Sequence, residues 1–242
     1  MIASPIIGHR GCARRAPENS LAAMTFSRDI GLDWVEIDAN LLGDGTAVMF
    51  HDSTLNRLTP AKGKLTKQTW ATVKDLDVGS HFSADFQAER LPSLEQALIH
   101  IRDLGLGLNL EIKHYPDVSI EHITDACIAA LDQHWRDFDR LLLSSFNGEI
   151  LARLHQARPN WLLGHLWERL PDNWLEVARI LDLASVNLDH KTLTQAQAEA
   201  IKTAGYDLYC YTVNDRAAAV RLWDWGVDGV FTDDPALISP AP

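Results

Sequence analysis

Short apolar segments rich in strand-forming residues alternate with amphipathic helical segments along almost the whole chain. This alternation constrains the fold most strongly, because repeated strand–helix units favour a parallel sheet covered by helices. The predicted strands are residues 5–9, 33–40, 107–112, 140–144, 161–166, 184–188, 207–213 and 229–232. The predicted helices are residues 20–31, 93–104, 118–134, 148–157, 173–183, 194–204 and 215–225.

Eight strand–helix units predict an α/β fold, a closed (β/α)8 or TIM barrel. The length of 242 residues agrees with the ~200–250 residues usual for this fold. An open, doubly wound sheet is the alternative, because periodicity alone does not show closure. No Gly-x-Gly-x-x-Gly pattern follows the first strand, which disfavours the dinucleotide-binding form of that sheet.

Two segments depart from the repeat. The turn signal Gly43-Asp44-Gly45-Thr46 predicts that residues 47–51 return along the end of the second strand, with position 51 opposite position 38. Residues 52–92 then hold several Pro and Gly residues and one short predicted helix near 68–76. An interval this long inside a repetitive α/β chain is typical of a functional loop or lid. We therefore expect a single domain over residues 1–242, with 52–92 as an insertion after the second strand.

Charge and composition exclude several classes of partner. The net charge is −11, from 33 acidic against 22 basic residues, so we expect no nucleic-acid partner and no stable association with an anionic membrane. No apolar stretch reaches the ~18–20 residues of a membrane span, and the first residues do not resemble a signal peptide. The three cysteines, Cys12, Cys127 and Cys210, lack paired spacing and are expected as reduced, apolar core residues. Together these features predict a cytoplasmic protein, a monomer or homodimer.

Acidic residues gather at two predicted strand ends. Residues two apart on a strand face the same side. Glu36 therefore shares a face with Asp38, and Asn109 shares one with Glu111 and Lys113. A solvated outer face is the alternative, but helices cover the outside of a barrel, where an unpaired acid is costly. Three converging carboxylates need a cation, and an all-oxygen ligand set suits Mg²⁺ or Ca²⁺, whereas zinc would recruit histidines.

Other strand ends carry groups suited to phosphate chemistry. Arg10 and Lys113 are candidates to contact phosphate oxygens. His9 and His51 come from different predicted strands, as a general acid and a general base on opposite sides of a reacting centre would. A metal, two cations and two imidazoles together predict phosphodiester cleavage.

The chain resembles the glycerophosphodiester phosphodiesterase family, in order and over essentially its whole length. The resemblance is carried by His9-Arg10-Gly11, Pro17-Glu18-Asn19-Ser20, Glu36-Ile37-Asp38, Asp44-Gly45, His51-Asp52-x-x-Leu55-x-Arg57-x-Thr59, Leu91-Pro92-Ser93-Leu94, Asn109-x-Glu111-Ile112-Lys113, Ser144-Ser145-Phe146, Tyr211-Thr212-Val213-Asn214 and Gly226-Val227-Asp228-Gly229-Val230-Phe231-Thr232-Asp233. The form without a signal peptide is similar to the cytosolic bacterial branch. The resemblance implies a barrel of the phospholipase C-like type, a divalent metal, and hydrolysis of deacylated phospholipids to sn-glycerol 3-phosphate and an alcohol.

The resemblance also implies a role for each matching residue. Glu36, Asp38 and Glu111 would bind the metal, and His9 and His51 would be the catalytic acid and base. Residues 52–92 would cap the mouth of the active site. The implied phosphate and substrate contacts are Arg10, Lys113, Asn109, Phe146, Thr212 and Asn214. Residues 12–15 and the segment after Thr59 depart from the family pattern, which bears on substrate preference.

Three other functions are alternatives. A phosphodiesterase acting on intact phospholipids is disfavoured by the net charge and the absence of an apolar anchor. A non-catalytic glycerophosphodiester sensor would have lost one of the five histidine or carboxylate residues named above, and all five are present. A sugar-phosphate isomerase on the same fold would not require two histidines and a carboxylate cluster together. The head group, the metal, the attacking hydroxyl and the division of roles between the histidines stay open.

Overall fold

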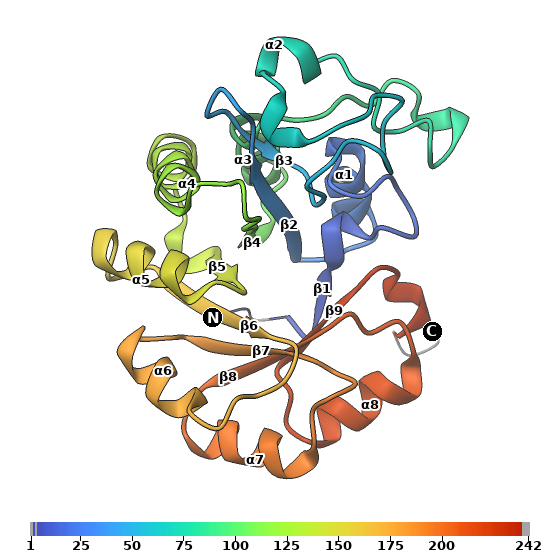
Figure 1. Ribbon diagram of the computed structural model, residues 1–242. Coiled ribbons are helices and arrows are strands. Elements are labelled where there is room, and N and C mark those ends of the chain that lie inside the picture. Colours follow the sequence, from blue (N-terminus) through green and yellow to red (C-terminus); the bar gives the residue numbers. More distant parts are fainter. Residues whose placement is uncertain (1, 3, 239–242) are drawn as a thin grey trace.

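Eight parallel strands close into a barrel in the computed structural model, which describes residue 2 and residues 4–238 (Figure 1). The barrel strands are β1 (Ile6–Gly8), β2 (Trp34–Leu41), β4 (Gly107–Ile112), β5 (Leu141–Ser145), β6 (Leu162–Trp167), β7 (Ser185–Asp189), β8 (Asp207–Tyr211) and β9 (Gly229–Thr232). Strand β1 closes the ring, because it pairs with β9 through three registered residues and with β2 through Gly8 and Val35. The closed barrel is confirmed and the open sheet is excluded.

Helices surround the barrel close to their predicted positions (Figure 1). Their bounds are α1 (Leu21–Asp29), α3 (Leu94–Asp103), α4 (Ile120–His134), α5 (Gly148–Ala157), α6 (Trp174–Ile180), α7 (Gln195–Thr203) and α8 (Arg216–Asp224). Side-chain caps begin most of them, and the predicted capping box of Ser93 and Gln96 is present at α3. Such caps satisfy backbone N–H groups that have no partner within the helix, at about 1 kcal/mol each. Among the described residues, none of these helices has the length and apolar content to cross a bilayer.

The alternation along the strands separates the core from the site. Val35, Ile37 and Leu110 pack outward in the main apolar cluster, together with residues of the surrounding helices. The other face of β2 points into the barrel, where Trp34 joins Tyr209, Phe231 and other apolar residues in a separate cluster. Glu36 and Asp38 follow Trp34 on this inner face, toward the carboxyl ends of the strands. The barrel therefore has an apolar floor and a polar mouth, the end at which such folds carry their active sites.

Strand β3 (Ala47–Met49) returns antiparallel to β2, as the turn signal predicts, but one residue out of the expected register. The backbone N–H of Phe50, rather than a group of His51, bonds to the Asp38 carbonyl at 2.9 Å. The reason lies in the turn: Leu42 and Thr46 close it around three residues, with Gly45 at φ +86°. The hairpin is thus centred on Asp44, and three-residue loops with a left-handed glycine are a common hairpin type.

Residues 52–92 form a compact segment next to β3, α1 and α3 (Figure 1). Its regular structure is limited to α2 (Trp70–Val73), shorter than the predicted helix, and two 3-10 turns (Leu65–Lys67 and Ala84–Phe86). Leu55, Leu65 and Val73 form an apolar cluster with residues of the β2–β3 hairpin, including Phe50. The segment is therefore ordered by a small core that it shares with the hairpin.

Candidate active site

Three carboxylates converge at the mouth of the barrel. The register between β2 and β4 places Asp38 opposite Glu111, with Glu36 one pleat deeper. One oxygen of each carboxylate lies within 4.8 Å of the others. Glu36 and Asp38 are 3% and 1% exposed, so water does not relieve their repulsion. Burial and then the neighbouring Asp38 charge raise the pKa of Glu36 to about 8.

This cluster fits a divalent cation. Glu36 Oε1 and Asp38 Oδ1 are buried without any hydrogen-bond partner, and such orphaned oxygens are costly unless something binds them. The donors are all carboxylate oxygens, the ligand type that Mg²⁺ and Ca²⁺ prefer. The convergence of these three carboxylates, which the alternating polar residues predicted, is confirmed.

Two cations and an amide flank the carboxylates. Lys113 Nζ lies 2.5 Å from Glu111 Oε1 and 3.6 Å from Asp38 Oδ1. The Arg10 Nε atom lies 3.3 Å from Asp38 Oδ2. Burial opposes ionisation of Asp38, but Lys113 and then Arg10 outweigh it and lower the pKa of that carboxyl to about 2. Asn19 fixes the same side chain, since its Nδ2 donates to Oδ2 at 2.8 Å and its Oδ1 accepts from the Asp38 N–H.

The loop after β1 is held in an unusual backbone conformation. A 3-10 turn spans His9–Gly11, and Arg10, Gly11 and Cys12 all have positive φ, of 49°, 72° and 70°. This turn points the Arg10 backbone N–H at Glu36 Oε2, 2.9 Å away. A Cβ at Gly11 would lie 2.8 Å from the Ala23 Cβ and 2.9 Å from the Ala23 carbonyl carbon, so the turn requires glycine there. Strained backbone of this kind persists where the surrounding structure fixes a functional group.

His9 is oriented by a carboxylate from the opposite end of the chain. Its Nδ1 lies 2.6 Å from Asp233 Oδ1, which leaves Nε2 facing Glu36 Oε2 at 3.9 Å. Burial opposes protonation of His9, but the hydrogen bond to Asp233 and the charge of Glu36 outweigh it and raise the pKa of this imidazole. Asn214 donates to Asp233 Oδ2 at 2.7 Å, and its own Oδ1 accepts from Thr232 and from the Asp233 N–H. The structure therefore places Asn214 behind His9, as a residue that positions Asp233, and not along the cavity.

His51 is oriented in the same manner from the other side. Its Nδ1 lies 2.8 Å from Asp52 Oδ1, and Arg57 holds that carboxylate with two hydrogen bonds of 2.8 Å. The same guanidinium donates to both oxygens of Glu18, which also accepts from Arg10 Nη1. An unbroken chain of contacts thus joins His51 to Arg10.

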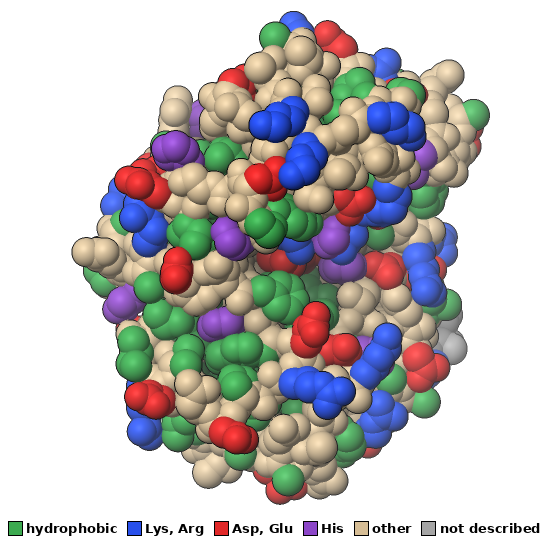
Figure 2. Space-filling view, viewed as in Figure 1, with side chains coloured by type: hydrophobic (Ala, Val, Ile, Leu, Met, Phe, Trp, Pro, Cys, Tyr) green, Lys and Arg blue, Asp and Glu red, His purple; other side chains and the backbone are tan. Residues whose placement is uncertain are grey.

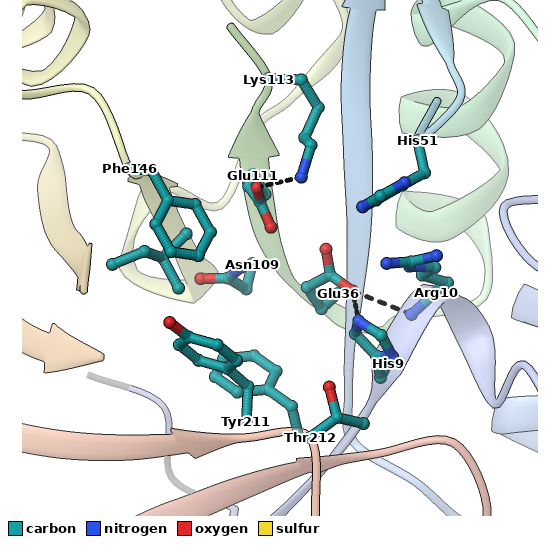
Figure 3. A pocket seen from close by; sticks show the side chains of 12 residues that line it. His9, Arg10, Glu36, His51, Asn109, Glu111, Lys113, Phe146, Tyr211 and Thr212 are labelled. Atoms are coloured by element: carbon teal, nitrogen blue, oxygen red, sulfur yellow. Dashed lines mark hydrogen bonds and ion pairs between the residues drawn. The ribbon is translucent and has the colours of Figure 1, made fainter. Parts of the chain in front are cut away.

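A cavity of about 190 Å³ opens over these groups, where Figure 2 shows a hollow with acidic, basic and histidine side chains gathered around it. It is lined by His9, Arg10, Glu36, His51, Asn109, Glu111, Lys113, Phe146, Leu166, Tyr211, Thr212 and Phe231. In Figure 3, His9 and His51 lie on either side of Arg10, and Phe146 and Tyr211 face them across Glu36. Asn109, Phe146 and Thr212 thus line this cavity. Among the described residues, Asp38 and Asn214 are the predicted site residues that do not line the cavity.

The sequence alone does not assign a role to several residues of the site. The motifs that carry the family resemblance include Asp52, Asp233, Glu18 and Asn19, but only the contacts in the fold show which side chains these four residues position. Leu166, Tyr211 and Phe231 also line the cavity, and the apolar patterns of their strands are indistinguishable from those of core strands.

Comparisons with known proteins identify the family. A model of the "Glycerophosphoryl diester phosphodiesterase family" matches residues 9–237. A glycerophosphodiester phosphodiesterase of Caldanaerobacter subterraneus subsp. tengcongensis is 31% identical over 238 residues, which are 96% of this chain and 95% of the relative. One from Bacillus subtilis is 29% identical over 249 residues, covering 96% of this chain and 84% of the relative.

Solved structures agree with these sequence relatives. A phosphodiesterase of Oleispira antarctica, solved in complex with the product sn-glycerol-3-phosphate, superposes with a TM-score of 0.93 at 37% identity, covering 96% of this chain and 94% of that one. A glycerophosphodiester phosphodiesterase of Agrobacterium tumefaciens gives a TM-score of 0.79 at 26% identity, over 97% and 98% of the two chains. The protein belongs to the glycerophosphoryl diester phosphodiesterase family.

Proposed function

We propose that this protein hydrolyses glycerophosphodiesters, small deacylated phospholipids, to sn-glycerol 3-phosphate and an alcohol. The observation that carries the proposal is the cluster of Glu36, Asp38 and Glu111 beside two histidines, each oriented by its own carboxylate. The family match and the product bound to the Oleispira antarctica relative support it.

Glu36, Asp38 and Glu111 would hold a divalent cation, Mg²⁺ or Ca²⁺. When bound, the cation supplies positive charge that stabilises the negative charge accumulating on the phosphate oxygens in the transition state. Arg10 and Lys113 add two cations beside the same oxygens, and both of these side chains are largely buried, where such interactions are strong. They capture an anion locally although the whole protein carries a charge of −11.

The two histidines would move the protons. The Nδ1 atoms bond to Asp233 and Asp52, so each Nε2 is free to act on the substrate. In our proposal His9 accepts the proton of the attacking hydroxyl, from water or the glycerol 2-position. His51 then donates a proton to the departing alcohol oxygen as the bond to phosphorus breaks. One positioned acid or base of this kind contributes ~10²–10⁴-fold to the rate.

The remaining parts of the chain would support this single active site. We propose one catalytic domain in the cytoplasm, with residues 52–92 narrowing access to the cavity for small diesters. Among the described residues, none between 52 and 92 lines the cavity itself, and the segment contacts the site through Asp52, which bonds to His51, and through Arg57.

The test is an assay of the purified protein on glycerophosphocholine, glycerophosphoethanolamine and bis-p-nitrophenyl phosphate, with and without a chelator. We expect hydrolysis that chelation abolishes and a divalent cation restores. A p-nitrophenolate leaves without a proton, so His51→Ala should retain far more activity on bis-p-nitrophenyl phosphate than on glycerophosphocholine, and His9→Ala should lose both. Full activity of metal-free protein, or equal losses for both variants on both substrates, would contradict the proposed mechanism.

A further inference from the structure

A second cavity, of about 330 Å³, adjoins the first and shares three of its lining residues, Glu111, Lys113 and Phe146. Its other lining residues come from the carboxyl ends of β4 and β5 and from the segments that follow them: Ile112, His114, Tyr115, Ser145 and Asn147. Figure 3 shows Lys113 and Phe146 at the edge of the first cavity away from His9. A diester with its phosphate at the carboxylate cluster therefore has two directions for its two alcohols, one along each cavity.

One wall of the second cavity is joined to His51. The Tyr115 hydroxyl donates to the backbone carbonyl of His51 at 2.6 Å, which joins this wall directly to that residue. In the proposed mechanism His51 protonates the leaving oxygen, so the leaving alcohol faces this wall. The first cavity, which Leu166, Tyr211 and Phe231 also line, then holds the glycerol.

The polar groups of the second cavity are arranged to bind a hydroxyl. The Asn147 side-chain oxygen accepts from the N–H groups of Glu149 and Ile150 at the start of α5, so its amide nitrogen must face His114. That nitrogen lies 3.1 Å from His114 Nδ1, which is therefore the acceptor. A neutral His114 then carries its proton on Nε2 and presents an N–H donor.

The charges of this cavity disfavour a cationic alcohol. Its two fully charged lining residues, Lys113 and Glu111, are paired at 2.5 Å, which leaves no free carboxylate for an ammonium group. Phe146 is 45% exposed and offers an aromatic face of the kind that binds quaternary ammonium groups. However, Lys113 Nζ already lies over this ring, 5.9 Å from its centroid, and would repel a second cation.

We propose that the second cavity is the subsite for the leaving alcohol and that it selects a neutral, hydroxylated head group, such as glycerol or inositol, over choline or ethanolamine. This inference rests on the proposed hydrolysis and names the substrate class of the same site. His114 is its specificity-determining residue, because its Nε2–H donates to a head-group hydroxyl that choline lacks.

The experiment compares kcat/KM of the metal-loaded enzyme for glycerophosphoglycerol, glycerophosphoinositol, glycerophosphocholine and glycerophosphoethanolamine. We expect the two neutral diesters to be preferred by about tenfold, the effect of one or two hydrogen bonds to the substrate. His114→Phe removes the donor and should reduce that preference by about tenfold, while His114→Gln, which keeps an N–H donor, should restore part of it. His122→Phe, an exposed histidine on α4, is the matched control and should leave all four values as they are.

All four substrates contain the same glycerol moiety and differ only in the leaving alcohol. A variant that disturbs the glycerol subsite can therefore be distinguished from one that disturbs the leaving-alcohol subsite. If the second cavity held the glycerol instead, His114→Phe would lower kcat/KM equally for every diester, which would overturn the assignment. A wild-type enzyme that hydrolyses the choline diester as well as the glycerol diester would overturn the selectivity. Hydrolysis of none of the four diesters would instead refute the proposed function.

Discussion

Each histidine of the site depends on one carboxylate for its orientation. Asp233 holds His9, and Asp52 holds His51, in both cases through Nδ1. A carboxylate at Nδ1 fixes the tautomer and stabilises the imidazolium that forms during proton transfer. The imidazoles would therefore be poor catalysts without these two acids, although neither acid lines the cavity.

We expect Asp233→Asn to lower kcat by about 10²–10⁴-fold, with little change in KM. Asparagine retains the size of the side chain and its bond to Asn214 but removes the charge that favours protonated His9. Steady-state kinetics on glycerophosphoglycerol measure the effect. Asp224→Asn, at an exposed position on α8, is the control, and a kcat for Asp233→Asn equal to that of this control would refute the orienting role.

The three thiols give a second prediction for single residues. Cys12, Cys127 and Cys210 are free and buried, in agreement with the expectation from their spacing. Burial raises the pKa of Cys12 to about 11 and that of Cys127 to about 12, so little reactive thiolate is present near neutral pH. A disulfide-exchange reagent such as DTNB should react with none of the three in the folded protein and with all three in denaturant. Rapid reaction of the folded protein would contradict their burial.

At the scale of elements, the sequence predicted the strand–helix alternation and the inward carboxylates, because both depend on local periodicity. Glu36 and Asp38 face inward because Val35 and Ile37, which alternate with them along β2, pack against the helices. The hairpin register could not be derived in the same way, because it depends on which residues close the turn around Asp44. The role of Asp233 was equally hidden, since its partner His9 lies 224 positions earlier.

Two side chains of segment 52–92 act on the site: Asp52 bonds directly to His51, and Arg57 holds Asp52 in place. Arg57 donates four hydrogen bonds, two to Asp52 and two to Glu18. It thereby links the loop after β3 to the loop after β1, and so fixes His51 relative to Arg10. A lysine would supply the charge but not the planar, doubly bidentate geometry.

We expect both Arg57→Lys and Arg57→Ala to lower kcat/KM by up to about 10²-fold, the cost of small misplacements in an active site. The far-ultraviolet circular dichroism should not change, because Arg57 is half exposed and belongs to no helix or strand. Lys67→Gln, an exposed change in the same segment, serves as the control. Wild-type kinetics for Arg57→Ala would show that the segment does not position the histidine.

Two of the three site carboxylates, Glu36 and Asp38, each keep one buried oxygen without a hydrogen-bond partner, and this bears on the stability of the whole molecule. A cation that binds only the folded protein stabilises it by about 2.7 kcal/mol at a hundredfold excess over Kd. For a chain of this size that corresponds to a rise in Tm of roughly 5–10 °C. We expect Mg²⁺, Mn²⁺ or Ca²⁺ to give such a shift, measured by differential scanning calorimetry, and Na⁺ at equal ionic strength to give none.

Asp38→Asn provides the matching variant for this measurement. It removes one charge from the cluster while keeping its shape, so the divalent cation should bind more weakly and the shift in Tm should shrink. An undiminished shift in this variant would place the cation elsewhere on the protein.

The closure of the ring by β1 and β9 also determines when, during synthesis of the chain, the active site is completed. A growing chain that has been synthesised only through β8 already contains His51, Arg57 and all three carboxylates. It lacks β9, the main partner of the three-residue β1, and it lacks Asp233, the acid that orients His9. We therefore expect hydrolysis to begin only once β9 has been translated and has paired with β1, and an unfinished chain on the ribosome to be inactive.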